Sequence, residues 1–81
     1  MNTDEARALI VAELSDIAPE VDFSTVAGDD DLAETLDIDS LDFQNFIAAV
    51  HKKTGINVPE SDYRQMATLD SAVAYLVGHS A

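Results

Sequence analysis

The chain has 81 residues, enough for one small domain, and 47% of them are hydrophobic. It contains no cysteine, which excludes disulfides and thiolate metal sites. Sixteen acidic residues against four basic ones give a net charge of −12, which argues against nucleic acids and anionic membranes as partners and favours basic protein surfaces.

The acidic residues are concentrated in the first half of the chain. Residues 1–42 hold 13 of the 16 acids and one base, whereas residues 43–81 hold three of each. Alanine and aliphatic residues dominate the apolar set, which favours helices over sheets. No apolar run approaches the roughly 20 residues that span a bilayer, and no signal-peptide pattern opens the chain. We therefore expect a cytoplasmic protein without membrane insertion.

The first predicted helix begins at Asn2 or Thr3, both good caps, and ends near Ala18 because Pro19 follows. Helical spacing gives it an apolar face of Ala6, Leu9, Ile10, Leu14 and Ile17, with Arg7, Glu13 and Asp16 off that face.

Residues 19–39 are predicted to form a long first loop with a short turn near residues 31–34. Its apolar members should pin it across the bundle: Val21, Phe23, Val26 and Leu32. The acidic run 29–31 lacks the spacing of a calcium loop, because Ala33 and Glu34 stand where Asp or Asn and Gly are needed. We interpret it as a solvated loop with loose divalent-ion binding at most, and we predict no metal site.

The stretch from Leu36 to Phe43 separates this loop from the second helix, about residues 40–53. Asp39 is a good N-cap, so Ser40 should lie in the first turn, beside unpaired N–H groups and the positive end of the helix dipole. That position suits a covalently attached phosphate. The predicted core face is Phe43, Phe46, Ile47 and Val50, with Leu41 near its start, and Gly55 ends the helix.

A short third helix should begin at Val58-Pro59-Glu60-Ser61, with Tyr63 and Met66 facing inward. Thr68 caps a last helix that Gly78 closes, and residues 79–81 should fray. Its predicted apolar stripe is Leu69, Ala72, Val73, Leu76 and Val77. Together these elements predict an all-α protein, a four-helix bundle with three longer helices, one short helix and a long first loop, forming a single domain over residues 1–81.

The motif Asp39-Ser40-Leu41, with Leu36 four residues before the serine, resembles the attachment motif of the acyl carrier proteins. The order and spacing of Val58-Pro59-Glu60, Met66, Thr68-Leu69 and the segment 72–76 match the second half of that family. The resemblance covers nearly all of the chain and is most specific from Leu36 to Leu76.

The resemblance implies that Ser40 carries 4'-phosphopantetheine donated by coenzyme A, with Asp39 as helix cap and contact for the modifying enzyme. It implies as partners a phosphopantetheinyl transferase and acyl-activating, condensing or acyl-transfer enzymes. The expected partner-binding residues around the serine are Asp37, Leu41, Asp42, Gln44 and Asn45. We expect a monomer. We also expect that it is not an enzyme, because neither histidine, 51 or 79, is placed to activate Ser40.

Two departures from the family pattern concern charge. The family usually has glycine where this chain has Asp37, and Asp tolerates positive φ better than most residues. Fatty-acid carriers usually have acids along the second helix, where this chain has Gln44, Asn45 and, near the end, His51, Lys52 and Lys53. This favours a specialised carrier serving a polyketide, an unusual lipid or a peptide-activating system over a housekeeping fatty-acid carrier.

Two alternatives remain open at the level of sequence. The first is a peptidyl carrier protein of a non-ribosomal peptide system. The second is an acidic helical interaction module without a prosthetic group, which charge and size allow but which gives no reason for a serine at the start of the central helix.

Overall fold

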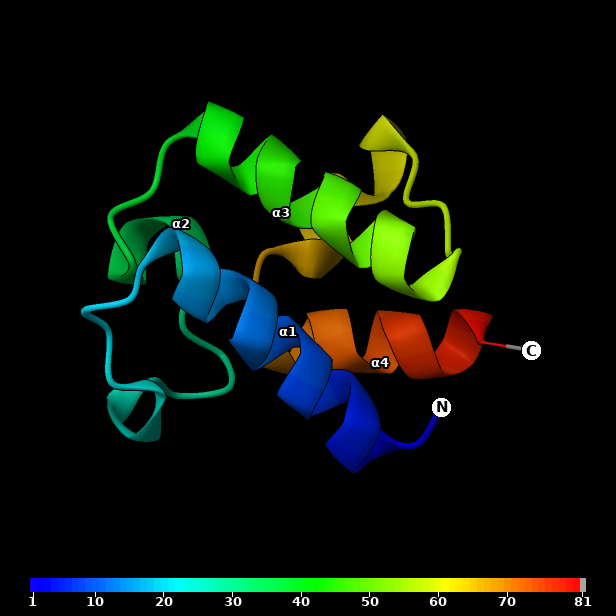
Figure 1. The fold of residues 1–81 in the computed structure, drawn as a ribbon, viewed down its shortest axis with the longest axis horizontal. Coiled ribbons are helices and arrows are strands. Elements are labelled where there is room, and N and C mark those ends of the chain that lie inside the picture. Colours follow the sequence, from blue (N-terminus) through cyan, green and yellow to red (C-terminus); the bar gives the residue numbers. More distant parts are fainter. Residues whose placement is uncertain (81) are drawn as a thin grey trace.

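Three long helices, α1, α3 and α4, form the bundle in the computed structural model, which describes residues 1–80 (Figure 1). Helix α1 packs against both α3 and α4, and a 3₁₀ helix, η2, packs against α4. All regular structure in these residues is helical, so the predicted all-α bundle is confirmed. The elements in order are α1 (Thr3–Ile17), η1 (Phe23–Thr25), α2 (Leu32–Thr35), α3 (Ser40–Thr54), η2 (Glu60–Met66) and α4 (Leu69–His79).

Side chains adjacent to the helices fix where they begin. Asn2 caps α1 in a capping box: its side chain accepts the Glu5 N–H at 2.8 Å, and the Glu5 carboxylate accepts the Asn2 N–H at 3.0 Å. Thr68 caps α4 by accepting the Ser71 N–H at 3.1 Å. Gly55 ends α3 in the left-handed conformation, with φ +74°, where a side chain would be strained. These boundaries were predictable from the residue types alone.

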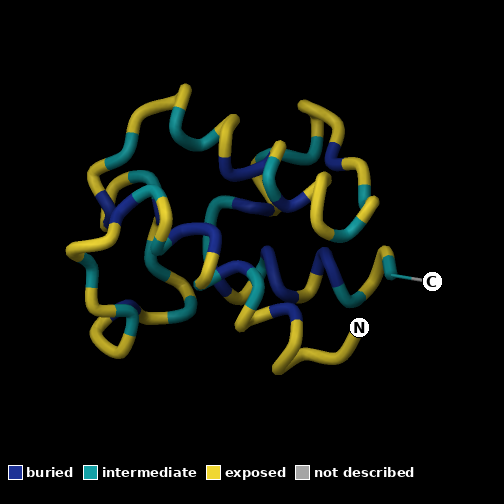
Figure 2. Tube along the Cα trace, in the orientation of Figure 1, coloured by how far each residue is buried: buried dark blue, intermediate teal, exposed yellow. Residues whose placement is uncertain are grey.

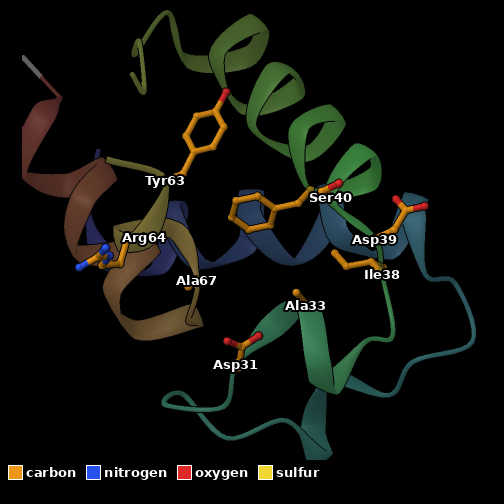
Figure 3. A pocket seen from close by; sticks show the side chains of 9 residues that line it. Asp31, Ala33, Ile38, Asp39, Ser40, Tyr63, Arg64 and Ala67 are labelled. Carbon is orange, nitrogen blue, oxygen red and sulfur yellow. The ribbon is translucent and has the colours of Figure 1, made fainter. Parts of the chain in front are cut away.

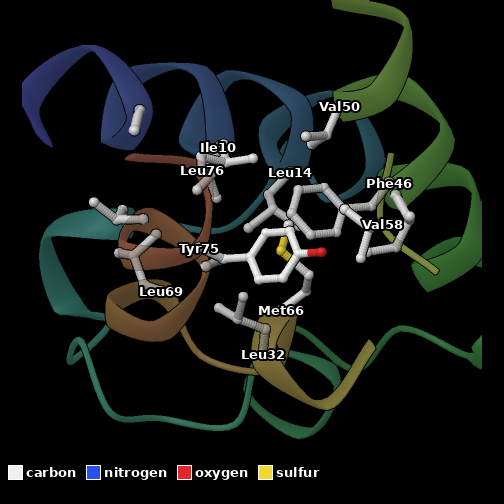
Figure 4. Close-up of a cluster of buried hydrophobic side chains, with 14 of the residues drawn as sticks. Ile10, Leu14, Leu32, Phe46, Val50, Val58, Met66, Leu69, Tyr75 and Leu76 are labelled. Carbon is white, nitrogen blue, oxygen red and sulfur yellow. The ribbon is translucent and has the colours of Figure 1, made fainter. Parts of the chain in front are cut away.

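The core lies where the inner faces of the three long helices meet (Figures 2 and 4). Met66 of η2 and Leu32 of α2 are fully buried and close the core from the side of the short elements. The largest side chains with no or almost no exposure are Phe46, Ile10, Leu14, Leu32, Met66, Leu69, Leu76 and Val50.

The connection between α1 and α3 is anchored by its apolar side chains and by its backbone. Val26 and Leu32 are buried, as predicted, while Val21 and Phe23 are partly buried. The Leu32 N–H donates to the Ala67 carbonyl at 2.8 Å, and the Asp70 N–H donates to the Gly28 carbonyl at 2.9 Å. The loop is therefore fastened to the corner between η2 and α4. The turn predicted near residues 31–34 is α2, whereas η1 was not predicted.

The assignment of Glu13 to the exposed side of α1 was wrong. Glu13 is buried, and its carboxylate pairs with the Lys53 ammonium of α3 at 3.1 Å. At about 100° per residue, position 13 lies nearer the centre of the buried face than Leu9 does, and Leu9 is only partly buried. The packing of α3 on α1 covers this flank, so Glu13 is buried despite its charge.

The assignment of Leu41 to the core face of α3 was also wrong. Leu41 is 63% exposed, because position 41 lies about 170° around the helix from the centre of the buried face that Phe46, Ile47 and Val50 form. It is therefore a large apolar side chain in contact with solvent next to Ser40.

Three predictions near the end of the chain need correction. Gly78 does not close α4, which continues through His79, whose ring stacks on that of Tyr75 with centroids 3.9 Å apart. Tyr75, which the predicted stripe omitted, is buried because η2 covers that flank of α4, and its hydroxyl donates to the Asp62 carboxylate at 2.9 Å. The predicted fraying of residue 79 was thus wrong, and Ala81 lies outside the described residues.

The predicted short third helix is the 3₁₀ helix η2, in which Met66 is buried and Tyr63 partly so.

Candidate functional site

Ser40 is the first residue of α3, and it is exposed. The Asp39 side chain accepts the Asp42 N–H at 2.8 Å, and the Asp39 carbonyl accepts the Phe43 N–H at 3.0 Å, so the predicted cap is confirmed. Ser40 therefore presents its hydroxyl beside the positive end of a 15-residue helix. A phosphate ester at this oxygen would be stabilised by that end of the helix.

A tight turn joins α2 to α3 just before Ser40. Asp37 has φ +54°, the one positive φ at a non-glycine residue among those described. The Ile38 N–H donates to the Ala33 carbonyl at 3.0 Å, which closes the turn directly behind Asp37. The sequence thus has an aspartate at the left-handed position, where it adds a surface charge three residues before the serine.

A cleft opens beside Ser40, between α2, the start of α3 and η2, with a volume of about 400 Å³ (Figure 3). The rings of Phe43 and Tyr63 meet edge to face in its wall, with centroids 6.1 Å apart. The residues that line it are Asp31, Ala33, Ile38, Asp39, Ser40, Phe43, Tyr63, Arg64 and Ala67. This cleft was not predicted from the sequence. The signal that could have indicated it is the set of apolar residues Ile38, Phe43 and Tyr63, which are only partly buried.

The outer face of α3 changes charge along its length. Asp37 and Asp39 are exposed and Asp42 is half-buried at the Ser40 end, whereas Gln44 and Asn45 are exposed and uncharged in the middle. Near the other end His51, Lys52 and Lys53 are exposed. Lys53 is already paired with Glu13, which leaves Lys52 as the unpaired lysine of this face. Of the predicted partner-binding set, Asp37, Leu41, Gln44 and Asn45 are thus accessible from solvent beside the serine.

Both histidines lie away from Ser40. His51 is eleven residues further along α3, about 16 Å by helical rise, and its Nδ1 lies 3.1 Å from the Ile56 carbonyl oxygen. His79 is in the last turn of α4, with Nδ1 at 2.8 Å from the Tyr75 carbonyl oxygen. Within residues 1–80, no three His, Asp or Glu side chains are grouped so that they could hold a metal ion. In the same residues no helix is long and apolar enough to cross a membrane.

Comparison with known proteins gives consistent matches over most of the chain. The family pattern described as the phosphopantetheine attachment site matches residues 8–76. The acyl carrier protein of Campylobacter hominis is 32% identical over 73 residues, which cover 90% of this chain and 86% of that protein. That of Helicobacter hepaticus is 31% identical over 77 residues, 94% of this chain and 95% of the relative. That of Renibacterium salmoninarum is 30% identical over 74 residues, 91% of this chain and 86% of the relative.

Proposed function

The chain belongs to the acyl carrier protein family, whose covalent 4'-phosphopantetheine holds acyl groups as thioesters, and on that premise we propose that Ser40 is the residue to which this group is attached. The observation that carries the proposal is an exposed hydroxyl at the start of α3, directly after the Asp39 cap. The remaining serines of the matched region lack this position: Ser15 is inside α1, Ser24 in η1, Ser61 in η2 and Ser71 in α4.

The residues around Ser40 fit a phosphodiester. The hydroxyl is accessible, and the first turn of α3 directs its N–H groups and dipole toward it. Asp39 is held by its hydrogen bond to the Asp42 N–H, so its carboxylate keeps the first turn in place beside the attachment oxygen. The bound group supplies a terminal thiol, which this cysteine-free chain lacks.

We propose that the protein is a passive acceptor and carrier, which agrees with the carrier role of its relatives. Activation of Ser40 would need a base within hydrogen-bond reach, and both histidines are engaged with backbone carbonyl oxygens on other parts of the bundle. The modifying phosphopantetheinyl transferase must therefore supply the base. What this chain contributes is a tether that raises the effective concentration of its cargo for each partner enzyme.

The proposed partners are that transferase and acyl-activating, condensing or acyl-transfer enzymes, which a monomer would meet in the cytoplasm. Leu41, 63% exposed and next to Ser40, offers them an apolar contact, and Asp37 and Asp39 offer charge. The uncharged middle of α3 at Gln44 and Asn45 supports a specialised pathway, because an enzyme that reads acids along this helix would find them only at its start.

Loading of the apo protein tests the attachment residue. Incubation with coenzyme A, magnesium and a broad-specificity phosphopantetheinyl transferase should add one phosphopantetheinyl group, measured as intact mass. Ser40→Ala should remain unmodified, whereas the matched control Ser61→Ala should be modified like the original chain. Asp39→Ala should be modified more slowly and lose about 0.5–2 kcal/mol of stability. Modification of Ser40→Ala would disprove the assignment.

Elongation by a ketosynthase of a housekeeping fatty-acid system tests the specialised role. The acylated protein should be elongated more slowly than the housekeeping carrier, and a Gln44→Glu, Asn45→Glu, Lys52→Glu variant should gain rate, most clearly at low salt. Lys53 stays unchanged in this variant, because its substitution would break the pair with Glu13 and confound recognition with stability. Equal elongation of the original chain and the housekeeping carrier would refute the charge argument.

A further inference from the structure

We infer that the cleft beside Ser40 favours acyl groups with a carboxylate at their far end, and that Arg64 is the residue that recognises this carboxylate. The inference rests on the proposed attachment at Ser40. It concerns the class of cargo, which neither the fold nor the comparisons specify.

The serine and the arginine that line the cleft lie at opposite ends of it. Figure 3 shows Ser40 at one side and Arg64 at the other. The Arg64 side chain is exposed, and its guanidinium points away from the serine, so it must turn back over the cleft to meet a ligand there. The rest of the lining is largely apolar and aromatic: Ile38, Phe43 and Tyr63, with the small residues Ala33 and Ala67. An acyl chain on the arm attached at Ser40, entering the cleft from the serine side, would bury its methylene groups against this wall and bring its far end toward Arg64.

The charges of the cleft distinguish Arg64 from its neighbours. Two acids also line it, and each accepts one backbone N–H while keeping its negative charge: Asp31 accepts that of Glu34 at 3.1 Å, and Asp39 accepts that of Asp42 at 2.8 Å. Arg64 is the one positively charged side chain among the lining residues. Arg64 has no ion pair within 4.0 Å and no side-chain hydrogen bond to any residue in the part of the chain that the structure describes. The ion pair found there joins Lys53 to Glu13.

An unpaired arginine at the end of an apolar cleft suits a ligand with an apolar body and an anionic end. The planar guanidinium can donate two parallel hydrogen bonds to a carboxylate, and its long stem lets it turn over the cleft. The phosphodiester expected at Ser40 cannot be this anion, because it would lie at the opposite end. A carboxylate of a partner enzyme could reach Arg64 from outside, and the experiment separates that case from cargo recognition.

The test compares two acyl groups of equal length, hexanoyl and adipoyl, which differ in one terminal carboxylate. Each is transferred from its coenzyme A thioester by a broad-specificity phosphopantetheinyl transferase, and intact mass verifies the loading. In the absence of any partner enzyme, the adipoyl form should melt about 2–4 °C above the hexanoyl form at low salt. Amide signals of residues 63–67 should shift more with adipoyl. Arg64→Gln should abolish both differences, and the control Arg7→Gln, on α1, should keep them.

Loss of the difference in 1 M NaCl, where the Debye length falls to about 3 Å, would confirm its electrostatic origin. Equal melting temperatures and equal amide shifts of the two loaded forms would overturn the inference. The role of Arg64 would then be contact with a carboxylate of a partner enzyme. Equal loss of the difference in Arg7→Gln would also overturn it, because net charge rather than Arg64 would then be responsible. A failure of Ser40 to accept either group would instead overturn the proposed function, and this inference with it.

Discussion

Breaking the ion pair between Glu13 and Lys53 should weaken the contact between α1 and α3. The Lys53 Nζ lies 3.1 Å from Glu13 Oε1. At that distance two unit charges attract by about 1.3 kcal/mol in water and about 5 kcal/mol at an effective dielectric constant of 20. The Glu13 side chain is 8% exposed but that of Lys53 is 61% exposed, so solvent screens much of the attraction. We therefore expect a coupling energy of about 1 kcal/mol, well below the cost of breaking a fully buried pair.

A double-mutant cycle measures this coupling. Glu13→Gln, Lys53→Met and the double variant are unfolded in urea and followed by circular dichroism, and the cycle isolates the pairwise term. Lys53→Glu should destabilise more than Lys53→Met, because it would bring a second carboxylate against Glu13. The control Lys52→Met, at the neighbouring exposed lysine, should change stability by less than about 0.5 kcal/mol. A coupling energy below about 0.2 kcal/mol would refute the assignment of a stabilising role to this pair.

Three further predictions concern the rest of the bundle. Asp37→Ala should lose about 1 kcal/mol because φ is +54° there, whereas Asp37→Gly should not, and equal melting temperatures of the two variants would contradict this. Burial, reinforced by the hydrogen bond to Asp62, raises the pKa of Tyr75 above its ordinary value of 10.0. The stability from that shift is intact below about pH 10 and is lost as the pH rises toward the folded-state pKa. Tyr75→Phe should therefore lose about 1 kcal/mol at pH 7 and show a flatter alkaline decline, and parallel pH profiles would argue against the linkage. Finally, the melting temperature should rise from low to moderate salt, and further with millimolar magnesium or calcium, because the net charge is −12; a flat response would show that the acids are too dispersed to matter.

The sequence was sufficient to predict features that depend on one residue type at one position. Asp39 and Thr68 cap their helices through their own side chains, and Gly55 ends α3 because it tolerates the left-handed conformation. The same holds for the prediction of an accessible Ser40, since a residue directly after a cap faces the open end of its helix. Local rules determine these features, and the bundle does not alter them.

Features that depend on which elements meet could not be predicted in this way. Glu13 is buried because α3 covers its flank of α1, and Tyr75 is buried because η2 covers a flank of α4 that the apolar stripe leaves out. The exposure of Leu41, in contrast, could have been predicted from its position around the helix. It was assigned to the core face only because leucine is usually buried. The cleft was missed because its walls come from α2, the start of α3 and η2, and the rest of α3 separates η2 from the other two in the sequence.

The fastening of the first loop to the corner before α4 has a consequence for biosynthesis. Ser40 and its cap are synthesised as one local segment, but the opposite wall of the cleft, with Tyr63, Arg64 and Ala67, is translated more than twenty residues later. The hydrogen bond from Leu32 to Ala67 and that from Asp70 to Gly28 then join the two halves. Under the proposed attachment at Ser40 and the proposed binding of cargo in the cleft, a chain loaded before its later part has folded would have no second cleft wall to cover the acyl group. The folding of η2 and its attachment to the first loop would then set the earliest moment at which the cargo can be protected.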